Sequence, residues 1–277
     1  MASMLRNIAV PLLFVYLLLP AAGRAAGCAA SPSSLNGWYG MLVSGSTVGA
    51  GATPKYLTGA LLFNGAGAIS AQHVYSGAGV DVAATGTYVV NSDCTVTITL
   101  TLSGGTPQVY TVAIKQSKQA VGIETDANAV ATIDLQPQYA TVTTGLNFTG
   151  SSLNGTFAAS CSGPAGSYTD LNLVTFTNGS LAGTDPYNNG GSVQASNDPY
   201  TGTYTINSDG TFSGSLVVAG TPFDYYGVIS NAGAKVEYIY SAVSNGTPTA
   251  AFASCTGKLA APIPGATLTV AAAVTPN

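Results

Sequence analysis

Hydrophobic and polar residues alternate most regularly between Cys94 and Leu102. Threonines there alternate with four apolar residues at every second position, namely Val96, Ile98, Leu100 and Leu102. Successive side chains of a strand point to opposite faces, so this spacing places the apolar set on one face and the hydroxyl groups on the other. Threonine is β-branched and suits the outer surface of a sheet. The pattern predicts a strand with one buried and one solvent-facing side.

Similar short runs, separated by turn residues, fill the chain from about residue 38 to residue 136. Several connections carry turn residues openly, among them Asn64-Gly65 and Asn91-Ser92-Asp93. Outside the N-terminal segment, no stretch has a convincing helical period. We therefore predict eight strands: Trp38–Ser44, Lys55–Asn64, Ala68–Tyr75, Val80–Asn91, Cys94–Ser103, Gln108–Lys115, Gln119–Thr125 and Val130–Gln136.

The pattern occurs twice in the chain. The stretch Thr85–Thr95 returns as Thr201–Thr211, and Ser33–Gly37 returns as Ser151–Gly155. Matches at a nearly constant offset indicate a tandem duplication. We expect repeats at residues 28–138 and 151–259, a connector at 139–150 and a loosely held tail at 260–277.

Eight sequential antiparallel strands with short hairpins have few stable arrangements. An up-and-down barrel removes both sheet edges, and eight strands enclose either packed side chains or one small ligand. A Greek-key sandwich, or one larger barrel shared by both repeats, are the alternatives. The sequence favours an all-β chain with two tandem eight-stranded antiparallel barrels.

The N-terminal segment, residues 1–25, is typical of a secretory signal peptide. Arg6 precedes an apolar run at Ile8–Leu19, and Gly23-Arg24-Ala25 forms a small-x-small cleavage site. The apolar run is much shorter than the about 20 residues that a transmembrane helix needs. We expect cleavage and export to the periplasm or the medium, with no transmembrane segment in the mature chain.

The charge balance excludes nucleic acid and anionic lipid as binding partners. Cleavage removes Arg6 and Arg24 but no acidic residue, which leaves five basic against eleven acidic residues and a net charge of −6. Such a chain has no positive surface with which to bind nucleic acid or anionic lipid.

Four cysteines remain after cleavage: Cys28, Cys94, Cys161 and Cys255. An even number in an exported chain favours two disulfides over a metal site. Of the three pairings we favour Cys28–Cys94 and Cys161–Cys255, one within each repeat. Cys28 has an alternative role, because Ala25-Ala26-Gly27-Cys28 is similar to a bacterial lipobox, although Ala25 stands where that motif usually has leucine.

The first repeat resembles a widespread group of exported bacterial domains of uncharacterised function. The resemblance is carried by Cys28, Leu35-Asn36-Gly37, Phe63–Gly67, Gly86-Thr87-Tyr88, Asp93-Cys94-Thr95 and Ile123–Asp126. It is weaker in the second repeat, which has Gly210 in place of Cys94. The resemblance implies a small calycin-like barrel, the architecture of lipocalins and avidins, and it implies no activity.

Few residues are candidates for chemistry. The single histidine, His73, suits a general base by type, and Glu124 and Asp126 should point to one face of a strand. Ordinary strand and turn positions explain all three equally well. We assign Asp81, Asp93 and Asp209 to turns, where aspartate bonds to the nearby backbone.

Tyrosines are the remaining candidates. Tyr88 and Tyr204 hold matching positions in the two repeats, which favours packing. Tyr225-Tyr226 and Tyr238-Ile239-Tyr240 have no such match, so they are candidates for an amphipathic pocket or a carbohydrate-facing surface. The chain has no nucleophile elbow, zinc-protease motif or phosphate-binding glycine loop, so we predict no catalytic residue, metal or cofactor.

Three functions remain open. The leading hypothesis is a non-enzymatic barrel that binds a small or apolar ligand. The second is a structural or surface-interaction module of the cell envelope or extracellular matrix. The third is a barrel-type cyclase or isomerase, for which a polar cluster inside the barrel would be the sign. The sequence indicates neither the ligand nor the oligomeric state.

Overall fold

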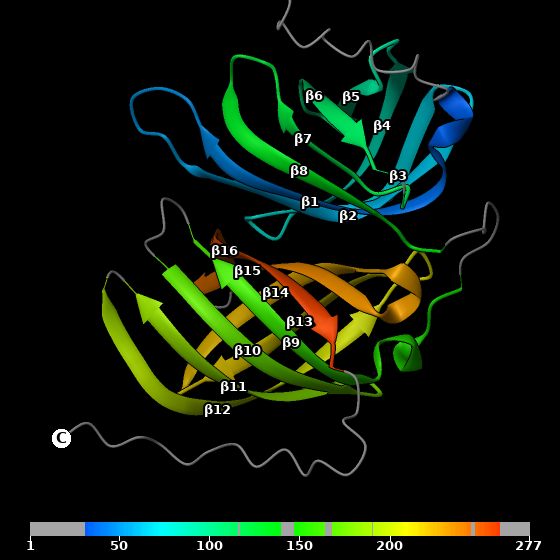
Figure 1. The fold of residues 1–277 in the computed structure, drawn as a ribbon. Coiled ribbons are helices and arrows are strands. Elements are labelled where there is room, and N and C mark those ends of the chain that lie inside the picture. The colour runs from blue at the N-terminus through cyan, green and yellow to red at the C-terminus, as the bar shows by residue number, and fades with distance from the viewer. Residues whose placement is uncertain are drawn as a thin grey trace, which may run out of the picture.

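The computed structural model describes residues 31–115, 117–139, 147–163, 168–189, 191–244 and 247–260. These residues form two closed antiparallel barrels that lie one against the other (Figure 1). The predicted signal peptide, Cys28, most of the connector and the tail from residue 261 lie outside the described residues.

The first barrel is built from eight strands in chain order, and β8 closes it by pairing with β1. The predicted strands agree with the observed ones to within a few residues at each end. The strands are β1 (Asn36–Thr47), β2 (Pro54–Asn64), β3 (Ala68–Ser76), β4 (Asp81–Val90), β5 (Thr95–Leu102), β6 (Pro107–Ile114), β7 (Ala120–Glu124) and β8 (Ala129–Pro137).

The second barrel repeats this plan, and its last strand, β16, pairs with its first, β9. Each barrel closes with its own strands, so the prediction of two tandem barrels is confirmed, and the sandwich and the shared barrel are excluded. The strands are β9 (Gly155–Ser162), β10 (Tyr168–Thr177), β11 (Ser180–Asn189), β12 (Ser192–Ile206), β13 (Thr211–Val218), β14 (Thr221–Ser230), β15 (Lys235–Ser244) and β16 (Thr247–Leu259).

Apolar side chains fill the inside of the first barrel. On β5, Val96, Ile98 and Leu100 are fully buried, while the threonines between them face outward, as the alternation predicts. Tyr39 and Phe63 pack edge to face in the same core, with ring centroids 5.1 Å apart. The inside of this barrel is therefore a packed core.

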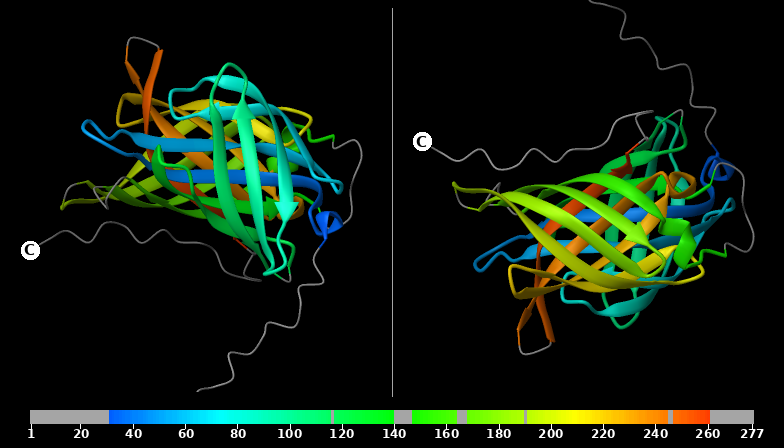
Figure 2. Two further views of the ribbon diagram at one scale, coloured as in Figure 1. Left: turned by 90° about the horizontal axis from the view of Figure 1, so that it is seen from above. Right: turned by 90° about the horizontal axis from the view of Figure 1, so that it is seen from below.

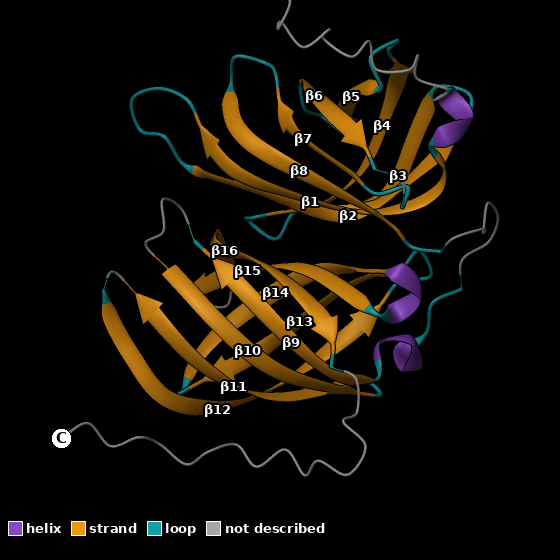
Figure 3. Cartoon of the chain, viewed as in Figure 1, coloured by secondary structure: helices purple, strands orange, loops and turns teal. Residues whose placement is uncertain are grey.

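A short 3-10 helix precedes the first strand of each barrel, which the sequence did not predict (Figure 3). They are η1 (Pro32–Ser34) and η2 (Gly150–Leu153); a third, η4 (Asn231–Gly233), lies between β14 and β15. Tyr88 donates its hydroxyl to the Pro32 and Leu35 carbonyls at 2.8 Å, and Tyr204 donates to the Gly150 carbonyl at 3.1 Å. The matched tyrosines thus hold the same element in both repeats.

The two barrels pack through their outer faces, β1 and β2 of the first against β14, β15 and β16 of the second (Figures 1 and 2). The centre of this contact is apolar and contains Leu42, Tyr56, Tyr75, Tyr226 and Ile239. Polar contacts cross it as well: Ser254 donates to Ser44 at 3.0 Å, and the Lys235 ammonium lies 3.3 Å from Asp134.

Within the described part of the chain, no helix is long and apolar enough to span a bilayer. In the same residues, no group of three or more histidine, cysteine or acidic side chains could hold a metal ion.

Candidate ligand site in the second barrel

Two aspartates lie side by side inside the second barrel, Asp170 on β10 and Asp185 on β11. Their exposed fractions are 6% and 8%, and their carboxyl groups lie close enough to interact with one another. Burial raises the pKa of Asp170 well above its usual range, and the neighbouring Asp185 raises it further. Burial also raises the pKa of Asp185. Two buried carboxyl groups in contact do not both ionise, so the pair holds a proton at neutral pH.

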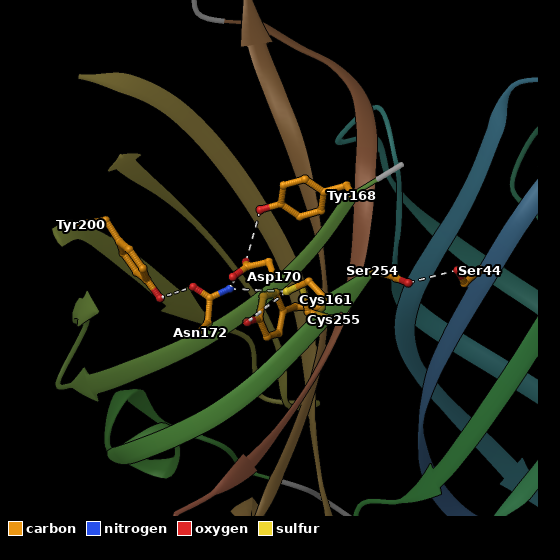
Figure 4. Close-up of a disulfide and its surroundings, with 9 residues drawn as sticks. Ser44, Cys161, Tyr168, Asp170, Asn172, Tyr200, Ser254 and Cys255 are labelled. Carbon is orange, nitrogen blue, oxygen red and sulfur yellow. Dashed lines mark hydrogen bonds between the residues drawn. A yellow bond between two sulfur atoms is a disulfide. The ribbon is translucent and has the colours of Figure 1, made fainter. Parts of the chain in front are cut away.

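Neutral polar side chains hold Asp170 in place (Figure 4). Asn172 donates its amide to the Asp170 carboxyl group, and the Tyr168 hydroxyl lies 3.3 Å from the same oxygen. The Asn172 carbonyl in turn accepts a hydrogen bond from Tyr200 at 3.0 Å. The Oδ1 atom of Asp170 and that of Asp185 accept no hydrogen bond from another residue. These two atoms are where the pair can share its proton or receive a ligand's donor.

The disulfide Cys161–Cys255 lies next to this group. It joins directly paired residues of β9 and β16, the two strands that close the barrel. The Asn172 amide nitrogen is 3.5 Å from the Cys161 sulfur, and the Tyr238 hydroxyl is 3.9 Å from it. This confirms the predicted second pair. The predicted first pair includes Cys28, outside the described residues, and stays a prediction.

Aromatic rings surround Tyr168 beside the acid pair. Tyr187 stacks on it with centroids 6.1 Å apart, and Phe252 meets it edge to face at 5.2 Å. Phe252 also contacts Tyr240 and Phe223, at 6.1 Å and 5.6 Å. The pair is therefore bordered by ring faces and edges on its aromatic side.

Deeper in the barrel, the rings leave little free space. The void among Val174, Phe176, Leu181, Leu216 and the four tyrosines at 200, 225, 238 and 240 has a volume of about 10 Å³. That is about the space one water needs. This void therefore has no room for the apolar ligand that the sequence favoured.

The first barrel lacks the acid pair. Gly37 and Gly155 open matching strands and pair with Phe63 and Phe176. If Phe63 on β2 is aligned with Phe176 on β10, Leu57 takes the position of Asp170. In the same alignment, Gly59 takes the position of Asn172. The acid pair is therefore not needed to close a barrel of this design.

The predicted carboxylates Glu124 and Asp126 do lie together, at one end of the first barrel, and they interact with each other. Glu124 points inward and pairs with Lys55 at 2.5 Å, with Lys55 6.0 Å from the Tyr110 ring. Asp126 accepts hydrogen bonds from the Val109 and Asn128 amides. The two side chains interact, but β7 ends at Glu124, so Asp126 lies beyond the strand and its contacts are those of a turn residue.

The other predicted residues have surface or turn positions. The His73 Nδ1 atom lies 2.9 Å from Asp81 Oδ2 at the surface, so Asp81 has a hydrogen-bond partner in addition to its place near a turn. Asp93 and Asp209 each accept from the backbone and hydroxyl of the threonine two positions later, as turn aspartates do.

The tyrosine candidates lie on opposite faces of their strands, because successive side chains of a strand alternate between the two faces. Tyr225, Tyr238 and Tyr240 point into the second barrel and line its void, whereas Tyr226 and Ile239 face the first barrel. The sequence missed Asp170, Asp185 and Asn172. The signal that could have found them is the presence of polar residues at inward positions of β10. Once the repeats are aligned by structure, these positions hold Tyr168, Asp170, Asn172, Val174 and Phe176.

No protein-family model and no curated protein sequence matches this chain. Among solved structures, a protein of unknown function from the DUF3598 family of Nostoc punctiforme matches with a TM-score of 0.30 and 10% identity, covering 84% of this chain and 100% of the other. A double mutant of the vaccine antigen transferrin-binding protein B from Haemophilus parasuis matches with a TM-score of 0.28 and 9% identity. That match covers 75% of this chain, and 63% of the length of the other protein. Neither structure is close enough to indicate a function.

Proposed function

We propose that this chain is an exported binding protein whose second barrel takes a small basic ligand at the Asp170–Asp185 pair. The observation that carries the proposal is the pair itself, two buried carboxyl groups in contact. Burying such groups destabilises a fold, and the first barrel closes with Leu57 at the matching position. A feature that destabilises the fold and is not needed to close the barrel is a candidate functional site.

A protonated primary amine fits the chemistry of the pair. Its N–H groups can donate to the two Oδ1 atoms, which accept no hydrogen bond from another residue. Its charge compensates the ionised pair, and the rings of Tyr168 and Phe252 favour a cation nearby. On binding, the proton that the pair shares leaves to solvent, so the ammonium replaces it.

Export is supported by the disulfide, because such bonds persist in oxidising compartments. The N-terminal signal pattern points the same way.

Calorimetric titration of the intact protein tests the site, with phenethylamine as the probe and 2-phenylethanol as its uncharged analogue. We expect the amine to bind at least about tenfold more tightly than the alcohol. Affinity should rise from pH 6 to pH 8 by up to about tenfold per unit, because one proton is released. Asp170→Asn should lower amine affinity, whereas Glu124→Gln, which alters a buried carboxyl group of the first barrel, should not. Equal affinity for amine and alcohol, or equal effects of the two variants, would refute the proposal.

A second candidate is a structural or surface-interaction module. It is favoured by the packed interior of the first barrel and the void of about 10 Å³ in the second. The polar cluster around Asp170 is the sign named for the cyclase or isomerase hypothesis, but the void deeper in the barrel has no room for a substrate. A folded protein that binds none of the probes would favour the structural module.

A further inference from the structure

A groove of about 330 Å³ lies on the outer face of the second barrel, over β12, β13 and β14. Register places its side chains in two rows of three, across neighbouring strands. Thr203 pairs with Ser215 and Ser215 with Asp224; Thr205 pairs with Ser213 and Ser213 with Tyr226. The groove is thus built on adjacent strands of one sheet and is separate from the acid pair inside the barrel.

The groove exists because the middle strand carries short side chains. Ser213 and Ser215 form the central column, between threonines on one side and Asp224 and Tyr226 on the other. At the matching place in the first barrel, Thr97 and Thr99 form the central column, and their β6 partners are Thr111 and Val109. The second copy therefore lacks two methyl groups in the middle, and has gained a carboxyl group and a phenol at the side.

The wall formed by Tyr226 is fixed by the contact between the barrels. Its ring stacks on Tyr75 of the first barrel with centroids 5.1 Å apart. The Tyr75 hydroxyl accepts a hydrogen bond from Asn207 at 3.0 Å and also interacts with Ser213. Tyr226 lies two positions after Asp224 on the same face of β14, and its hydroxyl interacts with the Asp224 carboxyl group beside the groove. A ligand would meet a wall already in place, which lowers the entropy cost of binding.

The lining selects one class of ligand. Its six polar side chains are five hydroxyl groups and one carboxyl group, with no lysine, arginine or histidine among the lining residues. The lack of a cation disfavours phosphates and other anions, and the predominance of oxygen atoms disfavours lipids. The groove is wide open to solvent, so it suits a ligand that lies along the surface.

We propose that this groove binds a neutral oligosaccharide, with Asp224 accepting hydrogen bonds from sugar hydroxyl groups and the serine and threonine hydroxyls bonding along the chain. A polyol offers both donors and acceptors, which matches hydroxyl groups that can do either. A carboxyl group held beside them strengthens the contact, because hydrogen bonds to charged groups are the stronger ones.

Amide chemical-shift mapping of the intact protein tests this, with neutral glucan, mannan and galactan hexasaccharides as probes. We expect saturable shifts over β12–β14 with at least one of them. Asp224→Ala should weaken that binding about tenfold or more, as expected for a lost hydrogen bond to a charged group. Ser213→Thr with Ser215→Thr, which restores the first barrel's column, should abolish it. The matched change in the first barrel, Thr97→Ser with Thr99→Ser, should leave it unaltered.

Asp170→Asn should also leave saccharide binding unaltered. The proposal for this groove and the proposal for the acid pair can therefore be refuted independently. Dispersed amide spectra confirm that each variant folds. The proposal is overturned if no hexasaccharide binds. It is also overturned if the shifted amides lie outside β12–β14 and Asp224→Ala does not change the affinity.

Discussion

Gly210 and Cys94 stand at the same turn in the two repeats, and both have a positive φ, 83° and 70°. The aspartate before each accepts the same two hydrogen bonds, so the turn has one design. In the second repeat the ends of the connector cover the turn. A Cβ atom on Gly210 would lie 2.6 Å from the Phe148 ring and 2.8 Å from the Gln138 amide. Glycine is required there by crowding as well as by conformation.

Gly210→Ala should therefore destabilise the protein more than an alanine that meets conformational strain alone. Gly104 is the matched control, because its φ is +77° and an added Cβ would meet nothing within 4 Å. We expect Gly104→Ala to lower the free energy of unfolding by about 1–2 kcal/mol, and Gly210→Ala to lower it further by about 1–3 kcal/mol because of overpacking. Urea unfolding measures both, and equal losses would contradict the crowding argument.

At the scale of elements, alternation predicted the strands of the first barrel well, because apolar residues there face inward at every second position. The same rule failed for the site. Asp170 and Asn172 occupy inward positions of β10, where a polar residue is indistinguishable by pattern from one that faces solvent. The short 3-10 helices were missed because their few residues carry no period. The packing of one barrel on the other depends on side chains such as Tyr226 that alternation labels as exposed.

Removing the disulfide should weaken the second barrel alone. Cys161→Ala with Cys255→Ala removes the bond between β9 and β16, and we expect a loss of about 2–4 kcal/mol. Thermal unfolding monitored by amide signals from each barrel separates the two contributions. Signals from β10–β15 should disappear at a lower temperature than in the unaltered protein, with those of β3–β6 changed less. An equal shift in both sets would mean that the barrels unfold as one unit.

At the scale of the whole molecule, the contact between the barrels encloses an ionisable group. Glu237 lies on the outer face of β15, and it is fully buried there, 2.9 Å from the Lys235 ammonium. Burial raises the pKa of Glu237 to about 8, against the lowering effect of Lys235. A carboxyl group whose pKa is higher in the folded protein favours folding most when both states are protonated.

Stability should consequently fall as the pH rises from about 4.5 to about 8. In this window the unfolded chain releases the Glu237 proton while the folded protein keeps it, so ionisation favours the unfolded state. Glu237→Gln should make the profile less steep. Asp170 and Asp185 have raised pKa values too, so the comparison is between slopes, measured by urea unfolding at pH 5, 6.5 and 8. Parallel profiles for the two proteins would show that Glu237 does not titrate in this range.

Each barrel should also fold alone, because each closes with its own strands. Fragments of about residues 28–138 and 150–258, expressed with an export signal, should each show a cooperative thermal transition. Because Tyr56 and Tyr75 of the first fragment, and Tyr226 and Ile239 of the second, lose their cover, we expect the fragments to bind each other when mixed. Gel filtration of the mixture measures this. Aggregation of both fragments in isolation would contradict independent folding.

The bond between β9 and β16 also determines what a protease can do to this protein. Any single cut between Cys161 and Cys255, for example at the exposed hairpin Ala219-Gly220, leaves both pieces covalently attached. The remaining strand pairings still hold the nicked barrel together. After limited digestion, the nicked protein should migrate as one species on a denaturing gel without reductant and as two with it. The position of this one disulfide thus keeps the protein in one piece after a single cleavage between Cys161 and Cys255.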